Sequence, residues 1–366
     1  MANALLVAPT LINGTSNGIK NMGDYIQSLA GEMFFEKIDE YIDREKLADY
    51  KSKTGKTRMI MNAWYMHFPE NWPPSDDILP LMISMHINPS IASRIFTAEG
   101  INYLKKHGPV GCRDEYTERL LKTHGIPCYF SGCLTLTLGE KYTPHKKNTT
   151  LFVHPHFEFY RNLKGRLSIL NVLQCLHFGL IYFKKIKRLQ RVFYNNTRIQ
   201  NTTGNIFVLL RKFLFFLYTA AFYKTYSSQF DDDVLFNAEY LEQDVRVGEG
   251  TTLVTEEDKI NFARNLVQKY AEASLVITSR IHCALPCIGL KTPVLFVQSD
   301  FFDQINQGSR LEGLIDLFQI MRLKKFTLTK VNTIQKDYIP LKEALLRRCR
   351  DFVLQSDDII TATPLR

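Results

Sequence analysis

The sequence predicts an α/β fold built from two Rossmann-like, doubly wound halves that face a cleft, with a basic helical insertion in the second half. Three observations support this prediction. Short apolar stretches alternate with amphipathic ones over residues 1–145, the alternation returns after residue 230, and 366 residues are many for a single core. We expect an N-terminal domain at 1–145, a C-terminal domain at 146–335 with the insertion at about 155–230, and a helix and tail at 336–366.

In the first half, strands are predicted where short apolar stretches end in polar or glycine-rich loops. These strands are Leu5–Ala8, Arg58–Ala63, Leu81–Met85, Val110–Cys112 and Cys128–Phe130. Apolar residues at helical spacing predict a helix over Gly23–Phe35. A second helix, Asp114–His124, has an acidic start and a basic end and is closed by Gly125.

The second half contains a strand, helix, strand unit. A capping pattern, Thr255-Glu-Glu-Asp258, predicts a helix that runs to about Ala273. The unit that follows consists of a buried strand, a short apolar helix and a second strand, and the chain closes with an amphipathic helix. These elements are predicted at Leu275–Thr278, Cys283–Gly289, Pro293–Val297 and Pro340–Leu354.

Composition is that of a globular protein, with 45% hydrophobic and 23% charged residues. Seven cysteines, an odd number without CxxC spacing, predict reduced thiols and argue against a disulfide framework, a zinc site or any other metal site. The first residues lack a basic region followed by an apolar one of signal-peptide length. We therefore expect a cytoplasmic protein.

The net charge of +9 comes from one segment. Between Lys146 and Phe230 there are 14 Lys and Arg residues against one acidic residue, Glu158. The same segment holds apolar, aromatic-rich stretches, none of which makes a clean transmembrane span. This pattern favours a peripheral position on an anionic membrane, at the inner face of the plasma membrane. A plain helical insertion with solvated charges and a nucleic-acid site remain open, although no nucleic-acid motif is present and we expect no nucleic-acid partner.

Polar residues gather at three predicted strand or helix ends. Asn21 and Asp24 lie at the start of the first helix, where Asp24 either caps the helix or faces the cleft as a proton acceptor. Arg113 directly follows a predicted strand, where it either forms a structural ion pair or binds an anion. The stretch TSRIH brings Arg280 and His282 to the beginning of a helix, a position that favours anions. P-loop, GxGxxG, HExxH and GxSxG motifs are missing from the sequence.

The chain resembles the polysaccharide pyruvyl transferases. The resemblance rests on NMGDYIQ, on GCRDEYTERLLKTHGIPCYFSGCLTLTL, and on ASLVITSRIHCALPCIGLKTPVLFV, in this order and spacing. TSRIH matches the Arg-Leu-His signature of the family with Ile281 in place of leucine. The resemblance covers the N-terminal domain and residues 255–300, but not the block 155–230. It implies a GT-B-like pair of domains, no cofactor, phosphoenolpyruvate as co-substrate and donor, and a sugar diol as acceptor.

The resemblance places Arg280 and His282 at the donor, and we extend the site around them. Phosphoenolpyruvate carries a phosphate and a carboxylate, so at least two cationic groups are expected to bind it. The expected donor ligands are Ser279, Arg280, Ile281, Arg113 and Arg310, and the expected acceptor ligands are Asn21, Asn62, Trp64 and His86. His282, titrating near neutrality, would be the general acid, and Asp24 the base. The acceptor is expected to be a saccharide, lipid-linked if the basic segment lies on a membrane. A nucleotide-sugar glycosyltransferase is the alternative.

Overall fold

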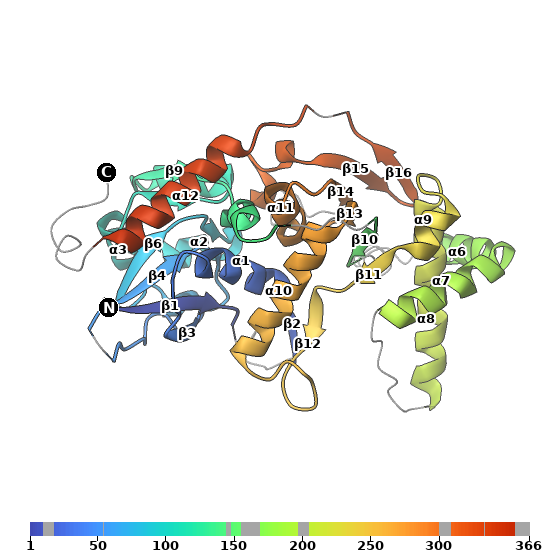
Figure 1. Cartoon of the computed structure of the whole chain (residues 1–366), viewed down its shortest axis with the longest axis horizontal. Helices are drawn as coiled ribbons and strands as arrows, with labels where there is room; N and C mark the ends of the chain where they lie inside the picture. Colours follow the sequence, from blue (N-terminus) through green and yellow to red (C-terminus); the bar gives the residue numbers. More distant parts are fainter. Residues whose placement is uncertain are drawn as a thin grey trace.

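The computed structural model describes residues 1–9, 18–53, 55–143, 148–154, 169–196, 205–299, 309–332 and 334–355. It is a mixed α/β structure with two parallel sheets (Figure 1). The first sheet has the strand order β3-β1-β4-β6, with all three pairings parallel. Its strands are β1 (Ala2–Val7), β3 (Glu40–Asp43), β4 (Thr57–Met61) and β6 (Ile78–Met82).

Strand β1 shows why this sheet is buried on both faces. Side chains alternate across a strand, so Leu5 and Val7 point to one face and Ala4 and Leu6 to the other. Leu5 and Val7 belong to an apolar cluster that includes helix α1 (Met22–Glu32), whereas Ala4 and Leu6 belong to a second cluster on the opposite face. The predicted strand at Leu5–Ala8 is therefore confirmed as a strand, although it begins three residues earlier.

The rest of the first half follows the predicted rhythm. Strands β8 (Val110–Cys112) and β9 (Cys128–Phe130) have the predicted bounds, and helix α4 (Glu115–Thr123) lies between them. The smaller elements are β2 (Ile19–Asn21), β5 (Trp64–Tyr65), η1 (Pro69–Asn71), β7 (His86–Ile87), η2 (Pro89–Ile91), α2 (Ala92–Ile95), α3 (Ala98–Lys106) and η3 (Leu134–Glu140).

The second sheet has the order β11-β10-β13-β14-β15-β16, parallel except for its last strand. The strands are β10 (Thr150–Val153), β11 (Glu239–Leu241), β13 (Leu275–Thr278), β14 (Val294–Ser299), β15 (Gln319–Lys324) and β16 (Thr327–Lys330). Helices α10 (Glu256–Glu272) and α11 (Ile281–Gly289) cover one face, where Val276 and Phe296 join the cluster that contains α1. The predicted capping box at Thr255 and Asp258 is present.

Two connections tie the halves together. Strand β2 pairs antiparallel with β12 (Asp244–Arg246), which belongs to the second half. Helix α12 (Ile339–Leu354) returns to the first half, where Arg58 donates a hydrogen bond of 2.8 Å to the carbonyl of Val353. The short elements η5 (Ser309–Leu311) and η6 (Ile315–Leu317) precede β15.

The described residues of the basic block form three helices on the other face of the second sheet, and a short helix follows the block. The three helices are α6 (Ile169–Ile181), α7 (Phe183–Asn196) and α8 (Asn205–Tyr226), and the short helix is α9 (Asp232–Asn237). Phe193 and Phe222 pack with Ile277 and Val297 of the sheet, so the inner side of the block is part of the core. In Figure 1 the block lies at the end of the molecule farthest from the first sheet. Within the described residues, no helix is both long and apolar enough to cross a bilayer.

Candidate active site

The candidate site forms where several strand and helix ends meet between the two halves. Asp24 lies in the first turn of α1, Arg113 follows β8, and His282 lies in the first turn of α11. Carboxyl ends of parallel strands and amino ends of the following helices are the usual ligand positions of such sheets. Helix α1 packs against α11, which brings Asp24 and His282 near each other, and Arg113 is close enough for its charge to act on His282.

His282 lies at the centre of this site. Its side chain is buried, and its Cβ would lie 3.1 Å from a Cβ added at Gly23, so the amino ends of α1 and α11 approach closely and leave little room for a side chain at residue 23. Burial lowers the pKa of His282 well below its ordinary value, and the positive charges of Arg113, Arg310, Arg44 and Arg280 lower it further. The expectation that His282 titrates near neutrality is therefore wrong for the unliganded protein, in which the imidazole is neutral.

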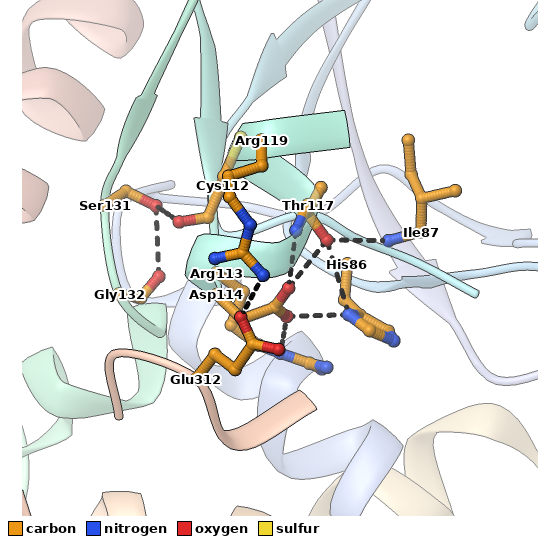
Figure 2. Close-up of polar contacts among 10 residues, drawn as sticks. All are labelled: His86, Ile87, Cys112, Arg113, Asp114, Thr117, Arg119, Ser131, Gly132 and Glu312. Atoms are coloured by element: carbon orange, nitrogen blue, oxygen red, sulfur yellow. Dashed lines mark hydrogen bonds and ion pairs between the residues drawn. The ribbon is translucent and has the colours of Figure 1, made fainter. Parts of the chain in front are cut away.

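Arg113 is fully buried and incompletely paired. None of its three guanidinium nitrogens has a hydrogen-bond partner among the described residues, and Nε lies 3.5 Å from Oδ2 of Asp114. That carboxylate is already used, because it lies 2.6 Å from Nδ1 of His86 and caps α4 through the backbone NH of Thr117 at 3.0 Å (Figure 2). A buried guanidinium with unused donors carries a large desolvation cost, which a bound anion would offset.

Arg310 reaches the same place from a distant part of the sequence. The segment after η5 is attached to the beginning of α4, since Glu115 donates its backbone NH to the carbonyl of Glu312 at 3.1 Å and Arg119 pairs with the Glu312 carboxylate (Figure 2). Burial lowers the pKa of Arg310 to about 10, and the neighbouring charge of Arg113 adds to this effect. Two guanidinium groups that repel each other are suited to an anion with more than one negative charge.

Arg280 contributes a third cation, held in a different way. It is the N-cap residue of α11, and one of its terminal nitrogens donates to Oδ2 of Asp244 at 2.6 Å and lies 2.8 Å from Nε2 of His154. His154 in turn lies 2.6 Å from a carboxylate oxygen of Glu242. The acidic residues around β12 therefore orient Arg280.

The remaining expected donor ligands, Ser279 and Ile281, are both buried, and the side chain of Ile281 packs in the apolar cluster that contains α1.

A small hollow lies at the ends of β1 and β4. Its polar lining consists of Asp24, Gln27, Ser28, Arg44 and Asn62. Oδ2 of Asp24 lies 3.7 Å from a terminal nitrogen of Arg44. Trp64, an expected acceptor ligand, does not line the hollow, and its ring lies 5.5 Å from the guanidinium of Arg44. Carboxylate, amide and guanidinium groups are thus gathered around one small opening.

Two expected acceptor residues have other roles in the structure. The side chain of Asn21 caps α1 and accepts a hydrogen bond of 2.9 Å from the NH of Gly23. His86 is fully buried against Asp114, and burial together with the charge of Arg113 lowers its pKa to about 4. Its Nε2 has no hydrogen-bond partner in the described part of the chain. Neither residue lines the hollow.

Sequence reasoning missed Arg44 and the shared role of Asp114. Arg44 follows β3, a short strand whose sequence EYID gave no clear apolar signal. Asp114 was expected only as the acidic start of a helix, a role it does fill, but its second oxygen also contacts His86. Arg113 could be proposed as a site residue because it follows a predicted strand. Arg44 also follows a strand, but that strand was not predicted, so the same argument could not be applied to it. All seven cysteines are free thiols, and no group of metal-ligating side chains is found within the described ranges.

The fold and the candidate site together define an α/β protein in which four arginines gather around a buried histidine where the two larger sheets meet. Comparison with protein families agrees with this class. Residues 21–300 match the model of the polysaccharide pyruvyl transferases, so the chain belongs to that family. The matched range contains Asp24, Arg113, Arg280 and His282, whereas Arg310 lies outside it. No curated protein gives a significant match to the chain.

Proposed function

We propose that this protein transfers the pyruvyl group of phosphoenolpyruvate to two hydroxyls of one sugar, forming a pyruvate ketal during synthesis of a surface polysaccharide. The observation that carries the proposal is the set of four arginines around His282, of which Arg113 and Arg310 have buried nitrogens without hydrogen-bond partners among the described residues. Phosphoenolpyruvate carries a dianionic phosphate and a carboxylate, and planar guanidinium groups bind both well. Membership of the family supports the same reaction class.

In this proposal the donor phosphate binds between Arg113 and Arg310, and its carboxylate binds Arg280. The positive charge of Arg113 lowers the pKa of Arg310, so the two guanidinium groups are near enough to interact, which supports a shared role in binding one dianion. Arg280 is already oriented by Asp244, so its positive charge is held in a fixed place. The negative charges of the donor would raise the pKa of the neighbouring His282, so that donor binding loads the general acid with a proton.

The reaction then proceeds through two additions at one carbon. His282 gives its proton to the methylene carbon, which becomes a methyl group, and positive charge develops at the neighbouring carbon that bears the phosphate. The first sugar hydroxyl attacks that carbon while Asp24 accepts its proton. The carbon–oxygen bond to phosphate breaks, and phosphate leaves with the bonding electron pair. The second hydroxyl attacks and closes the ring, and its proton leaves with hydrogen phosphate.

The acceptor would bind at the surface beside Asp24, at the opening of the small hollow. Asn62 and Arg44 line this hollow. Amide and charged groups bind sugar hydroxyls. The two halves would act as a GT-B-like pair, with the acceptor on the first half and the donor largely on the second. We further propose that the acceptor is a lipid-linked saccharide, which would reach the protein at a membrane.

Calorimetry tests the donor assignment. The protein is titrated with phosphoenolpyruvate and with a panel of nucleotide sugars, in the native form, as Arg280→Gln and as Arg246→Gln. Arg246 is an exposed arginine of β12 and serves as the matched control. Selective phosphoenolpyruvate binding that is lost in Arg280→Gln and kept in Arg246→Gln supports the proposal. Binding of a nucleotide sugar instead would assign the protein to glycosyl transfer. Mass spectrometry of a diol-containing saccharide incubated with the protein and donor then identifies the ketal.

A further inference from the structure

Helix α6 presents an apolar stripe to solvent. The stripe consists of residues that are each 52–76% exposed, namely Ile169, Leu170, Leu173, Leu180 and Ile181. Helical spacing places them on one side of the helix, in two groups near its ends, with the exposed polar residues Gln174 and His177 between the groups in the sequence. Soluble proteins rarely expose several large aliphatic side chains on one side of a helix, and such groups mark interaction surfaces.

The stripe faces outward because the opposite side of α6 is fixed. Cys175 and Gly179 are buried, and a Cβ added at Gly179 would lie 2.8 Å from the ring of Phe216 on α8. The two helices therefore approach so closely that α6 cannot turn its apolar side inward without separating from α8. Phe222 and Leu217 of α8 in turn pack in the core of the second sheet. The exposed apolar residues are thus a feature of a well-packed helix.

Basic residues follow the stripe along the chain. Helix α7 follows α6 after one residue and exposes five cations, which are Lys184, Lys185, Lys187, Arg188 and Arg191. Among the described residues, the one carboxylate within ion-pair distance of these cations is Asp232, which lies 2.7 Å from Nζ of Lys185. Nζ of Lys187 lies 5.6 Å from the centre of the Phe183 ring. The apolar stripe and these five cations are here called the α6–α7 surface.

We propose that the α6–α7 surface docks on an anionic lipid bilayer. The stripe would enter the boundary between headgroups and acyl chains, as interfacial helices with an apolar side do, and the cations would pair with lipid phosphates. In Figure 1 this surface lies at the far end of the molecule from the first sheet and apart from α1 and α11, so docking leaves the active site open.

Two other occupants fit the surface less well. Nucleic acid would use the cations, but isoleucine and leucine side chains neither contact phosphates favourably nor stack on bases. A second copy of the chain would cover the stripe, but a symmetric dimer places the same patch on both sides, so the cations of one copy would face those of the other. An anionic bilayer satisfies both parts of the surface at once.

Vesicle co-sedimentation tests the proposal with the full-length protein. Vesicles of phosphatidylcholine alone are compared with vesicles that also contain phosphatidylglycerol. The apolar variant is Leu170→Gln, Leu173→Gln, Leu180→Gln, and the basic variant is Lys184→Gln, Lys187→Gln, Arg191→Gln. Matched controls on exposed residues elsewhere are Ile334→Gln with Leu354→Gln, and Lys51→Gln, Lys53→Gln with Lys105→Gln. Because every substituted side chain is exposed, far-ultraviolet circular dichroism should confirm that all variants are folded.

We expect the native protein and both controls to sediment with the anionic vesicles. The apolar variant should bind at least about tenfold more weakly, and the basic variant about a hundredfold more weakly at low ionic strength. Raising the salt concentration should weaken vesicle binding by the native protein and by the apolar variant. It should have less effect on the residual vesicle binding of the basic variant. Equal sedimentation of all variants, or none for the native protein, would overturn the proposal. So would a native dimer that the apolar variant converts to a monomer without any vesicle binding, or duplex DNA binding in place of vesicle binding.

Discussion

Replacing Arg113 by methionine distinguishes a ligand-binding arginine from a structural one. In the structure none of the Arg113 nitrogens donates a hydrogen bond among the described residues, and the nearest carboxylate, Asp114, keeps His86 and Thr117 as partners when the arginine is removed. Methionine has a similar length and an adaptable side chain, so it can fill the space without a large cavity.

The expected effect on stability follows from the burial of this charge. Replacing a poorly compensated buried cation by an apolar side chain of similar volume is neutral or stabilising by about 1–4 kcal/mol, whereas removing one partner of a tight buried ion pair costs about 3–5 kcal/mol. The effect on donor binding has the opposite sign. Each charge-assisted hydrogen bond contributes about 1.5–3 kcal/mol, so the loss of two should weaken phosphoenolpyruvate binding at least about a hundredfold.

Thermal unfolding with and without phosphoenolpyruvate measures both effects in one assay. Arg58→Met is the matched control, because Arg58 donates hydrogen bonds of 3.1 Å to Asn3 and 2.8 Å to the carbonyl of Val353, outside the site. We expect Arg113→Met to keep or raise its unfolding midpoint and lose the shift caused by phosphoenolpyruvate. Arg58→Met should lower the midpoint and keep the shift. If Arg113→Met loses as much stability as Arg58→Met and still responds to phosphoenolpyruvate, Arg113 is structural and the reasoning is wrong.

Three further predictions concern the neighbours of Arg113. Binding of phosphoenolpyruvate at pH 7 should be accompanied by uptake of a proton, which calorimetry in buffers of different ionisation enthalpy measures. The variant His282→Gln should not take up this proton. If the variant takes up as much as the native protein, His282 is not the general acid. In Gly23→Ala the added Cβ would lie 3.1 Å from the Cβ of His282 and should displace the imidazole slightly. We expect kcat/KM to fall about tenfold with little loss of stability. Unaltered kinetics would contradict the close packing of the two residues. Because burial lowers the pKa of His86 to about 4, the unfolded chain binds more protons below pH 6.5, and stability falls as the pH drops towards 4. Between pH 7 and pH 5, His86 should account for about 2 kcal/mol of the decrease in the free energy of unfolding, measured with urea. The variant His86→Asn should lack this part of the decrease. If its free energy of unfolding decreases as much as that of the native protein, other groups are responsible.

Local patterns predicted much of the fold. Strands β8, β9 and β13 have the predicted bounds, and helix α10 begins at the predicted capping box, because apolar stretches and capping residues act over a few neighbouring positions. Strand β3 was missed because its charged sequence carries no apolar signal; parallel pairing with β1, a long-range contact, makes it a strand.

Part of the candidate site was predictable in its position but not in its electrostatics. Arg113, Arg280 and His282 follow strands of parallel sheets, where ligands usually bind, and the structure places both arginines near enough for their charges to act on His282. The low pKa of His282 was not predictable, since it depends on burial in the folded chain and on four arginines from separate parts of the sequence. Arg310 reaches the site only through the contact of Glu312 with α4, and local sequence carries no trace of that contact.

The basic block was predicted as an addition to the second domain, yet its inner side forms part of the core. Phe193 and Phe222 pack beneath the sheet strands, so only the outer side of the block is available for partners. Hydrophobicity alone could not separate these two sides, because α6 is apolar on both. The packing of α6 on α8 through Gly179 decides which side is exposed.

One apolar cluster runs through both halves, from Leu5 and Val7 of β1 to Val276 and Phe296 of the second sheet. The two halves of this protein therefore do not behave as independent modules joined at a linker. A chimera made by joining its first half to the second half of another protein would place unmatched side chains at the seam between α1 and α10 and between η3 and α11. Because Asp24 lies on α1, even exchanges near the candidate site must keep the side chains of α1 that meet α10.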